Sequence, residues 1–143
     1  MDIASLIVDR PSADIVRCEA ATRARDAVAL LARRRIGALP VMDGGSVVGI
    51  FSERDVLYCL EQEGVAALDR TVGEVMTAPA ITVSPATKVD EALALMTRRR
   101  VRHLPVIDRE VMCGFISIGD LVKSRLDEVE RDAAAMRDYI QTA

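Results

Sequence analysis

The chain has 143 residues, half of them apolar, so it is long enough and apolar enough to fold around a buried core. Its 19 Lys and Arg residues are balanced by 22 Asp and Glu residues, giving a formal net charge of −3. This balance disfavours a general nucleic-acid binder, because neutralising phosphates requires a concentrated excess of Lys and Arg.

Targeting and metal-binding signals are missing from the sequence. The longest apolar run, Ala27–Ala32, is far shorter than the roughly 18 residues of a membrane span. The N-terminus lacks the basic stretch of a secretory signal. Cys18, Cys59 and Cys113 are dispersed, which favours reduced structural thiols, and a single histidine, His103, excludes a multi-histidine metal site. We expect a cytoplasmic protein with no membrane partner.

An internal repeat organises the chain. Residues 22–57 align with residues 87–122 at a constant offset of 65 without a gap, and 14 of these 36 positions are identical. The identical positions include Arg33–Arg35 and Arg98–Arg100, Leu39–Val41 and Leu104–Val106, and the Gly, Ser and Asp of positions 49, 52 and 55 and of positions 114, 117 and 120. Units of about 60 residues bury little surface alone, so we expect them to pack about a pseudo-twofold axis.

Each unit is predicted to fold as β-α-β-β-α, an α/β (α+β) arrangement. In the second unit a β-branched run over 80–83 predicts a strand, and Thr87 is predicted to cap a helix that ends at arginines 98–100. Strands over 103–107 and 111–116 follow, and the equivalent turn of the first unit reads Asp-Gly-Gly. The serines at positions 52 and 117 then begin the two closing helices.

A long helix is predicted beyond the second unit. Its apolar residues follow an a/d spacing over Val122, Leu126, Val129, Ala133, Met136 and Ile140. This stripe either packs on its own module or contacts a second copy of the chain. We favour a homodimer, because apolar residues on a projecting helix would otherwise stay exposed. The expected divisions are repeats over 1–66 and 67–126 and a helical extension over 127–143.

The candidate site lies where the two closing helices begin. Residues 49–55 and 114–120 both read glycine, two apolar residues and Ser-x-x-Asp. The simplest interpretation is a capping box, worth about 0.5–2 kcal/mol. The same residues also suit a nucleotide, because glycine permits close approach, the helix N-terminus attracts phosphate and aspartate accepts hydrogen bonds from a ribose. The residues alone leave both interpretations open.

The duplicated unit, with its Leu-Pro-Val-x-Asp strand and its Ser-x-x-Asp ending, resembles the CBS domain, and two in tandem resemble a Bateman module. The resemblance covers about residues 3–126. It implies that clefts between the repeats bind an adenosine-containing ligand: AMP, ADP, ATP, NAD(H) or S-adenosylmethionine. It also implies that the chain regulates a separate partner protein and is not itself an enzyme.

The resemblance also implies a role for particular residues. The residues implied for the ligand sites are Val16, Arg17, Ser52, Asp55, Thr82, Val83, Arg102, His103, Ser117 and Asp120. The aspartates would hold ribose hydroxyls, the serines would contact phosphate or ribose, and the first-strand residues would border the adenine. The pair that faces phosphates in this family is Arg102-His103 in the second repeat but Gly37-Ala38 in the first. We therefore expect one competent site and a second that is weaker, differently selective or empty.

Other interpretations remain open. An enzyme is disfavoured, because the sequence has no Ser-His-Asp or Cys-His set, no metal cluster and no Walker loop. An interaction scaffold with vestigial sites is the stronger alternative. The arginine triplets are most simply solvated helix C-termini, although one could supply an arginine to a polyphosphate. Phe51 and Phe115 are expected in the core.

Overall fold

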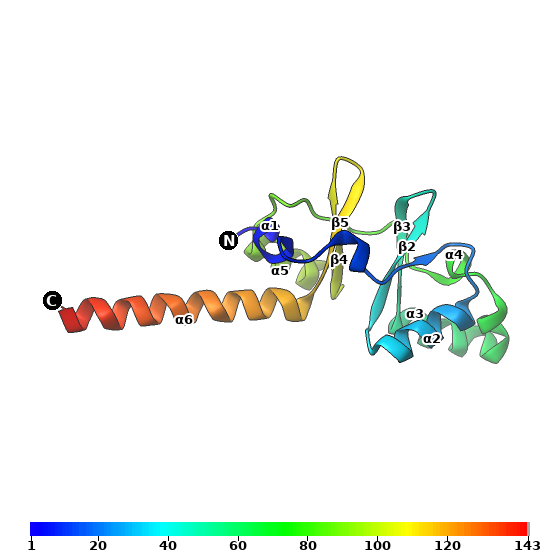
Figure 1. The fold of residues 1–143 in the computed structure, drawn as a ribbon. Coiled ribbons are helices and arrows are strands. Elements are labelled where there is room, and N and C mark those ends of the chain that lie inside the picture. Colours follow the sequence, from blue (N-terminus) through cyan, green and yellow to red (C-terminus); the bar gives the residue numbers. More distant parts are fainter. Residues whose placement is uncertain (143) are drawn as a thin grey trace.

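The computed structural model describes residues 1–142 as two small sheets with flanking helices, from which one long helix projects (Figure 1). The predicted α/β (α+β) class and the two repeats are confirmed. The elements up to the second repeat are α1 (Ile3–Ile7), η1 (Ser12–Asp14), β1 (Cys18–Glu19), α2 (Ala24–Arg34), β2 (Ala38–Asp43), β3 (Ser46–Ser52), α3 (Glu53–Glu63), η2 (Gly64–Asp69) and α4 (Val72–Val75). The second repeat contains α5 (Val89–Arg99), β4 (His103–Asp108), β5 (Val111–Ser117) and α6 (Ile118–Thr142).

The two hairpins show how closely the repeats match. β2 pairs with β3 and β4 pairs with β5, both antiparallel, and each pair has its register shift at the same relative position. Each hairpin closes through two residues of positive φ, at Gly44 and Gly45 in the first and at Arg109 and Glu110 in the second. This is the backbone pattern of a type I′ turn. The second repeat therefore keeps the turn although it lacks the glycines, which adopt positive φ at little cost in conformational energy.

The predicted first strands are shorter than expected. β1 contains two residues and runs parallel to β2, whereas the segment 80–83 is not a strand and makes only a parallel bridge between Val83 and Val106. Val83 donates to the carbonyl of Pro105 and accepts from the amide of Ile107, at 3.0 and 2.8 Å. Pro85 stands two residues further on and has no N–H to donate, so the pairing cannot continue beyond Val83 in that direction.

The predicted cap at Thr87 is wrong. Helix α5 begins one residue later than a Thr87 cap would allow, with Lys88 at the N-cap position and no side-chain cap. The Thr87 hydroxyl instead accepts a hydrogen bond from the amide of Ser84 at 3.1 Å, which closes the turn through Ser84-Pro85. The charge pattern of α5 is as predicted, with Asp90 and Glu91 in the first turn and arginines in the last.

Each repeat has its own apolar core, and each core is completed by a segment that precedes the other repeat. Ile3 of α1 is fully buried among the core residues of the second repeat, and its amide donates to the carbonyl of Thr87 at 2.9 Å. Val72 of α4, which leads into the second repeat, is fully buried in the core of the first and donates to the carbonyl of Thr22 at 2.7 Å. The two entry segments are thus exchanged between the repeats.

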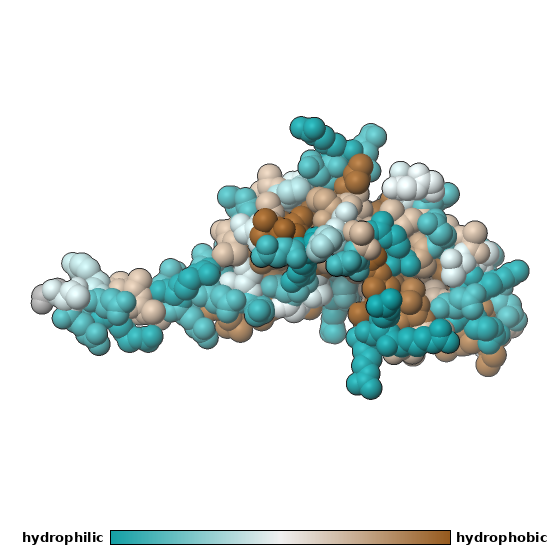
Figure 2. Space-filling view, viewed as in Figure 1, coloured by the Kyte–Doolittle hydropathy of each residue, from teal (hydrophilic) through white to brown (hydrophobic). Residues whose placement is uncertain are grey.

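The long helix α6 is confirmed, and its outer part makes few contacts with the rest of the chain. Figure 2 shows apolar side chains exposed between charged ones along this helix. All six residues of the predicted apolar stripe are exposed, so the stripe does not pack on its own module. Arg125 contacts Glu128 and Asp90. Among residues 1–142, no helix combines the length and the apolar character that a bilayer crossing requires.

The three cysteines are free. Cys18 and Cys59 are buried, and Cys113 is partly buried beside the carbonyl of Val106. Burial, with a smaller contribution from the charge of Glu19, raises the pKa of the Cys18 thiol to about 11. A thiol in that state is protonated at neutral pH and unreactive, which fits the predicted structural role.

Gly49 lies on the first sheet where the exchanged linker packs directly against it. A Cβ there would lie 2.6 Å from Met76 Sδ and 2.7 Å from the carbonyl oxygen of Thr77. We expect Gly49→Ala to lower the free energy of unfolding by about 1–3 kcal/mol, the usual cost of overpacking, in urea titrations followed by circular dichroism.

Gly119→Ala is the matched control, because the nearest atom to its Cβ, Ser117 Oγ, would lie at an ordinary 3.6 Å. Equal urea midpoints for the two variants would show that the linker does not constrain Gly49.

Candidate functional site

Both Ser-x-x-Asp motifs form capping boxes at the starts of α3 and α6. In the first, the amide of Ser52 donates to Asp55 Oδ2 at 2.8 Å, and in the second the amide of Ser117 donates to Asp120 Oδ2 at 2.9 Å. The serine hydroxyls accept from the aspartate amides in return. In each motif the cap occupies one carboxylate oxygen, Oδ2, and leaves the other for a different partner. Capping and ligand binding are therefore compatible.

The other carboxylate oxygen is contacted by one of the exchanged segments. Arg10 Nη2 lies 3.0 Å from Asp120 Oδ1, and Thr77 Oγ1 donates to Asp55 Oδ1 at 2.7 Å. Asp55 is buried, whereas Asp120 is only partly buried. The two sites thus differ in accessibility and in the charge of the group that holds the carboxylate.

Asp120 is held in its ionised form. Burial by itself would raise the pKa of this carboxyl group, but the hydrogen bonds from Arg10 and from the amide of Ser117 outweigh burial and hold the pKa below its usual value. At neutral pH the group is a carboxylate that accepts hydrogen bonds and donates none.

A cavity of about 400 Å³ lies between the two repeats beside Asp120, and we call it the Asp120 cavity. It is lined by Asp9, Arg10, Pro11, Asp14, Ile15, Val16, Ile36, Ala38, His103, Phe115, Ser117 and Asp120. Four residues selected from the sequence meet here: Val16, His103, Ser117 and Asp120. Their separation along the chain shows that the site is built from both repeats.

An aromatic pair forms one wall of the Asp120 cavity. The rings of His103 and Phe115 stack with their centroids 5.5 Å apart and their planes at 15°. Phe51 is fully buried as predicted, but Phe115 is only partly buried and faces the cavity. The 65-residue offset aligns Phe51 with Ile116, so Phe115 falls on the opposite face of its strand.

His103 is neutral in this setting. Burial is the largest influence and lowers the pKa of its imidazole, although the charges of Asp120 and Glu53 oppose the shift. A neutral imidazole offers one donor and one acceptor to a ligand and contributes no positive charge.

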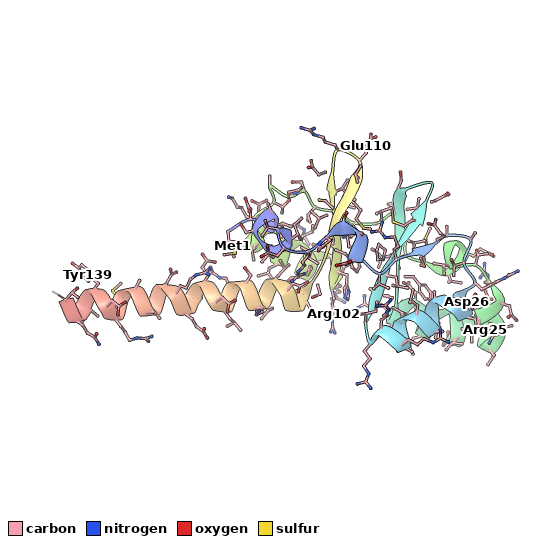
Figure 3. The ribbon with its side chains drawn as sticks, in the orientation of Figure 1. Met1, Arg25, Asp26, Arg102, Glu110 and Tyr139 are labelled. Carbon is pink, nitrogen blue, oxygen red and sulfur yellow. The ribbon has the colours of Figure 1, made fainter. Side chains whose placement is uncertain are left out.

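The other residues selected from the sequence lie outside this cavity. Arg17 donates to the carbonyls of Ile15 and Ser12, at 3.2 and 2.6 Å, and so braces the turn η1. Ser52 and Asp55 belong to the first capping box. Arg102 lies exposed at the start of β4 and does not line either of the two cavities (Figure 3).

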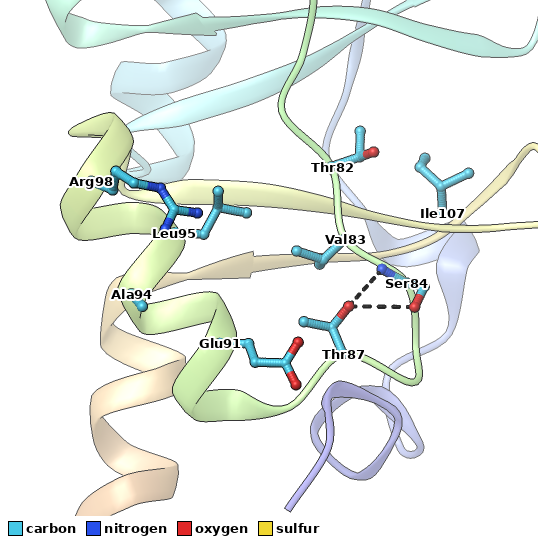
Figure 4. Close-up of a pocket in the computed structure, with 9 residues that line it drawn as sticks. All are labelled: Thr82, Val83, Ser84, Thr87, Glu91, Ala94, Leu95, Arg98 and Ile107. Carbon is cyan, nitrogen blue, oxygen red and sulfur yellow. Dashed lines mark hydrogen bonds between the residues drawn. The ribbon is translucent and has the colours of Figure 1, made fainter.

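Thr82 and Val83 line a second, open cavity of about 600 Å³ on the flank of the second repeat, which we call the Arg98 cavity. Figure 4 shows it between α5, which carries Arg98, and the segment that carries the Ser84–Thr87 hydrogen bonds. One member of the second arginine triplet therefore does border a cavity. That cavity contains neither motif aspartate, so it differs from the predicted cleft between the repeats.

Sequence reasoning selected four of the lining residues and missed the others, of which Ala38 and Arg10 matter most here. Ala38 is the offset partner of His103, so the repeat alignment assigns it to the first-repeat site, whereas it lines the cavity beside Asp120. Arg10 precedes the aligned segment 22–57 and belongs to no motif, so the sequence contains no signal that it reaches Asp120.

Comparison with known proteins gives a consistent result. A model of the CBS domain matches residues 4–62 and 72–127. The mitochondrial CBS domain-containing protein CBSX3 of Arabidopsis thaliana is 39% identical over 121 residues, which cover 81% of this chain. The chain spans 59% of the length of that relative.

Solved structures extend the match to the fold. A CBS-domain protein from Burkholderia ambifaria MC40-6 is 38% identical, with a TM-score of 0.81, covering 89% of this chain and 95% of that chain. The structure of CBSX2 in complex with AMP is 25% identical, with a TM-score of 0.76, covering 88% of this chain and 96% of that chain.

The burial of His103 makes stability depend on pH near neutrality. Its folded pKa lies below the ordinary value of 6.5, so the unfolded chain binds a proton that the native state does not. The resulting stability is fully present above about pH 6.5 and is lost as the pH falls through that value. Because the chain has one histidine, we expect wild type to lose more unfolding free energy than His103→Gln between about pH 7.5 and 5.5.

Urea titrations of both proteins at the two pH values measure this difference. The carboxylates are common to both, so identical pH dependence would show that His103 is not held neutral by the fold.

Proposed function

The chain belongs to the CBS-domain family, and we propose that it is a regulatory module that binds an adenosine nucleotide in the Asp120 cavity and passes the occupancy of that cavity to a partner protein. The observation that carries the proposal is the meeting of an apolar wall and an ionised carboxylate between the two repeats. The volume of about 400 Å³ falls within the usual range of small-molecule sites.

The lining of the cavity suits the parts of an adenosine nucleotide. Val16, Ile36 and Ala38 offer an apolar surface from the first repeat to a flat base. Across the cavity, Asp120 Oδ1 can accept hydrogen bonds from a ribose diol, and the hydroxyl of Ser117 lies beside it. His103 adds a neutral donor and acceptor.

We place AMP first among the adenosine ligands. The related protein CBSX2, 25% identical over most of its length, was solved in complex with AMP. ADP, ATP, NAD(H) and S-adenosylmethionine are the alternatives, and longer phosphate chains would need cations beyond Arg10. Arg102, exposed and next to His103 in the chain, is the candidate that the sequence named for this role.

The second site is proposed to be the weaker one. Ser52 and Asp55 would hold the ribose there, whereas Thr82 and Val83, which the resemblance implied for its base, line the Arg98 cavity. Asp55 is buried and already has its free oxygen bonded to Thr77, so a ligand must first break that contact. One nucleotide per chain is the expected stoichiometry.

A homodimer formed through residues 127–143 is the second part of the proposal. The apolar stripe of α6 is exposed, and Asp120 lies in the first turn of the same helix. A ligand at Asp120 would thus touch the helix that meets the second copy. A dimeric interaction scaffold with vestigial sites would use the same stripe without the cavity. For either form we propose a cytoplasmic protein that catalyses no reaction.

AMP should raise the melting temperature, because a ligand that binds only the native state stabilises it. We expect Asp120→Asn to weaken AMP binding about 10-fold to 100-fold in isothermal titration calorimetry, since a hydrogen bond to a charged group contributes about 1.5–3 kcal/mol. Asp90→Asn, at an exposed acidic position in the first turn of α5, should bind AMP as wild type does.

If the two variants bind AMP with equal affinity, the motif Ser117-x-x-Asp120 only caps its helix and does not hold the ligand. No thermal shift with AMP, ATP, NADH or S-adenosylmethionine would favour the scaffold.

The dimer is tested by placing charge on the stripe. Val129→Glu combined with Met136→Glu should halve the mass measured by light scattering, because burying two carboxylates in an apolar interface is costly. Arg131→Glu lies on the opposite face of α6 and should leave the mass unchanged. An unchanged mass in the double variant would contradict an interface at the stripe.

A further inference from the structure

We propose that Arg10 determines the ligand charge that the Asp120 cavity accepts, by pairing with Asp120 in the free protein and with the phosphate of a bound nucleotide. The inference rests on the proposed nucleotide-binding function and deepens it. It gives the site a specificity residue that lies outside the two aligned segments, 22–57 and 87–122, and outside both motifs.

Charge on the cavity lining supports this role. Among the lining residues Arg10 is the one arginine, and no lysine is present, whereas Asp9, Asp14 and Asp120 contribute three carboxylates. His103 is held neutral by burial and adds no positive charge. Without Arg10 the cavity would present only negative formal charge to a phosphate group, and like charges at close range repel. A phosphorylated ligand therefore needs this guanidinium.

The geometry of the Arg10–Asp120 pair allows an exchange of partners. The guanidinium contacts Asp120 Oδ1, the same oxygen that a ribose diol would use. The two side chains are 50% and 25% exposed, so the pair is solvated and weak. A ribose that takes over Oδ1 displaces Arg10 and at the same time brings the 5′ substituent of the nucleotide within reach of the displaced guanidinium.

The backbone around Arg10 keeps the displaced side chain at the cavity. On one side, Ile3 anchors α1 in the core of the second repeat. On the other, Arg17 braces η1 through the carbonyls of Ser12 and Ile15. Arg10 lies between these anchors, so its side chain can change partner while the segment that carries it stays in place.

At the other site the group that holds the aspartate is uncharged. Thr77, the group on Asp55, has a neutral hydroxyl, and the position offset by 65 from Arg10 is Val75. A phosphate at that site would gain nothing from the displaced group. Arg10 thus gives the Asp120 site a preference for a phosphorylated ligand that the Asp55 site does not gain from Thr77. The repeat alignment cannot show this difference.

The test compares AMP with adenosine, which differ only in the phosphate. Wild type is expected to bind AMP at least about tenfold more tightly than adenosine in calorimetry at low salt. In Arg10→Met we expect the preference to disappear, with AMP at least about tenfold weaker and adenosine equal or tighter, because the competing guanidinium is gone. Arg10→Lys should restore part of the preference for AMP.

Arg125→Met is the matched control, since Arg125 is similarly exposed and pairs with Asp90 and Glu128 outside the cavity. It should keep the wild-type ratio. Added salt should weaken the binding of AMP to wild type and leave that of adenosine equal or slightly tighter, which gives a readout that needs no variant.

Any of three results would overturn the role of Arg10. The ratio of AMP affinity to adenosine affinity could be unchanged in Arg10→Met, the variant could lose equal affinity for both ligands, or AMP binding to wild type could be independent of salt. Failure of wild type to bind either ligand would overturn the proposed function as well, so the two failures are distinguishable.

Discussion

The exchange of entry segments is the constraint on which the rest of the structure depends. The lead-in before the first repeat buries Ile3 in the core of the second, and the linker before the second buries Val72 in the core of the first. Full burial of such a side chain contributes about 1.5–3 kcal/mol, so each repeat depends on a segment that does not belong to it. The same exchange brings Arg10 to Asp120 and Thr77 to Asp55. The cavity is therefore a property of the pair of repeats.

Elements with local signals were predictable from the sequence. The Asp-Gly-Gly turn predicts the first hairpin, and the gapless repeat transfers it to the second, where Arg109 and Glu110 adopt the same positive φ. The Ser-x-x-Asp spacing alone predicts the capping boxes at the starts of α3 and α6. The predicted Thr87 cap was wrong because a threonine hydroxyl can accept a hydrogen bond either from a helix amide or from a turn amide. Here it accepts from the amide of Ser84 and closes the Ser84-Pro85 turn. No local pattern distinguishes these uses. Arg10 was missed because its contact spans 110 residues.

Duplication gave the two sites the same motif, and their surroundings made them different. Both aspartates close a capping box, yet one carboxylate is buried beside a hydroxyl and the other is accessible beside a guanidinium. His103 stacks on Phe115 where the first repeat has Ala38 and Ile50. These substitutions lie on one cavity, and in the proposed function they favour a single nucleotide. Because Asp120 lies in the first turn of α6, a ligand held there would contact the helix that carries the exposed stripe.

The most direct test of nucleotide binding in the Asp120 cavity uses the one histidine of the chain as a reporter. NMR spectra of protein labelled with ¹⁵N at histidine contain the imidazole signals of His103 alone. If AMP occupies this cavity, those signals will move saturably, with the dissociation constant that calorimetry gives for the same sample. Calorimetric heat of binding with an unmoved imidazole signal would place the nucleotide elsewhere and contradict the assignment.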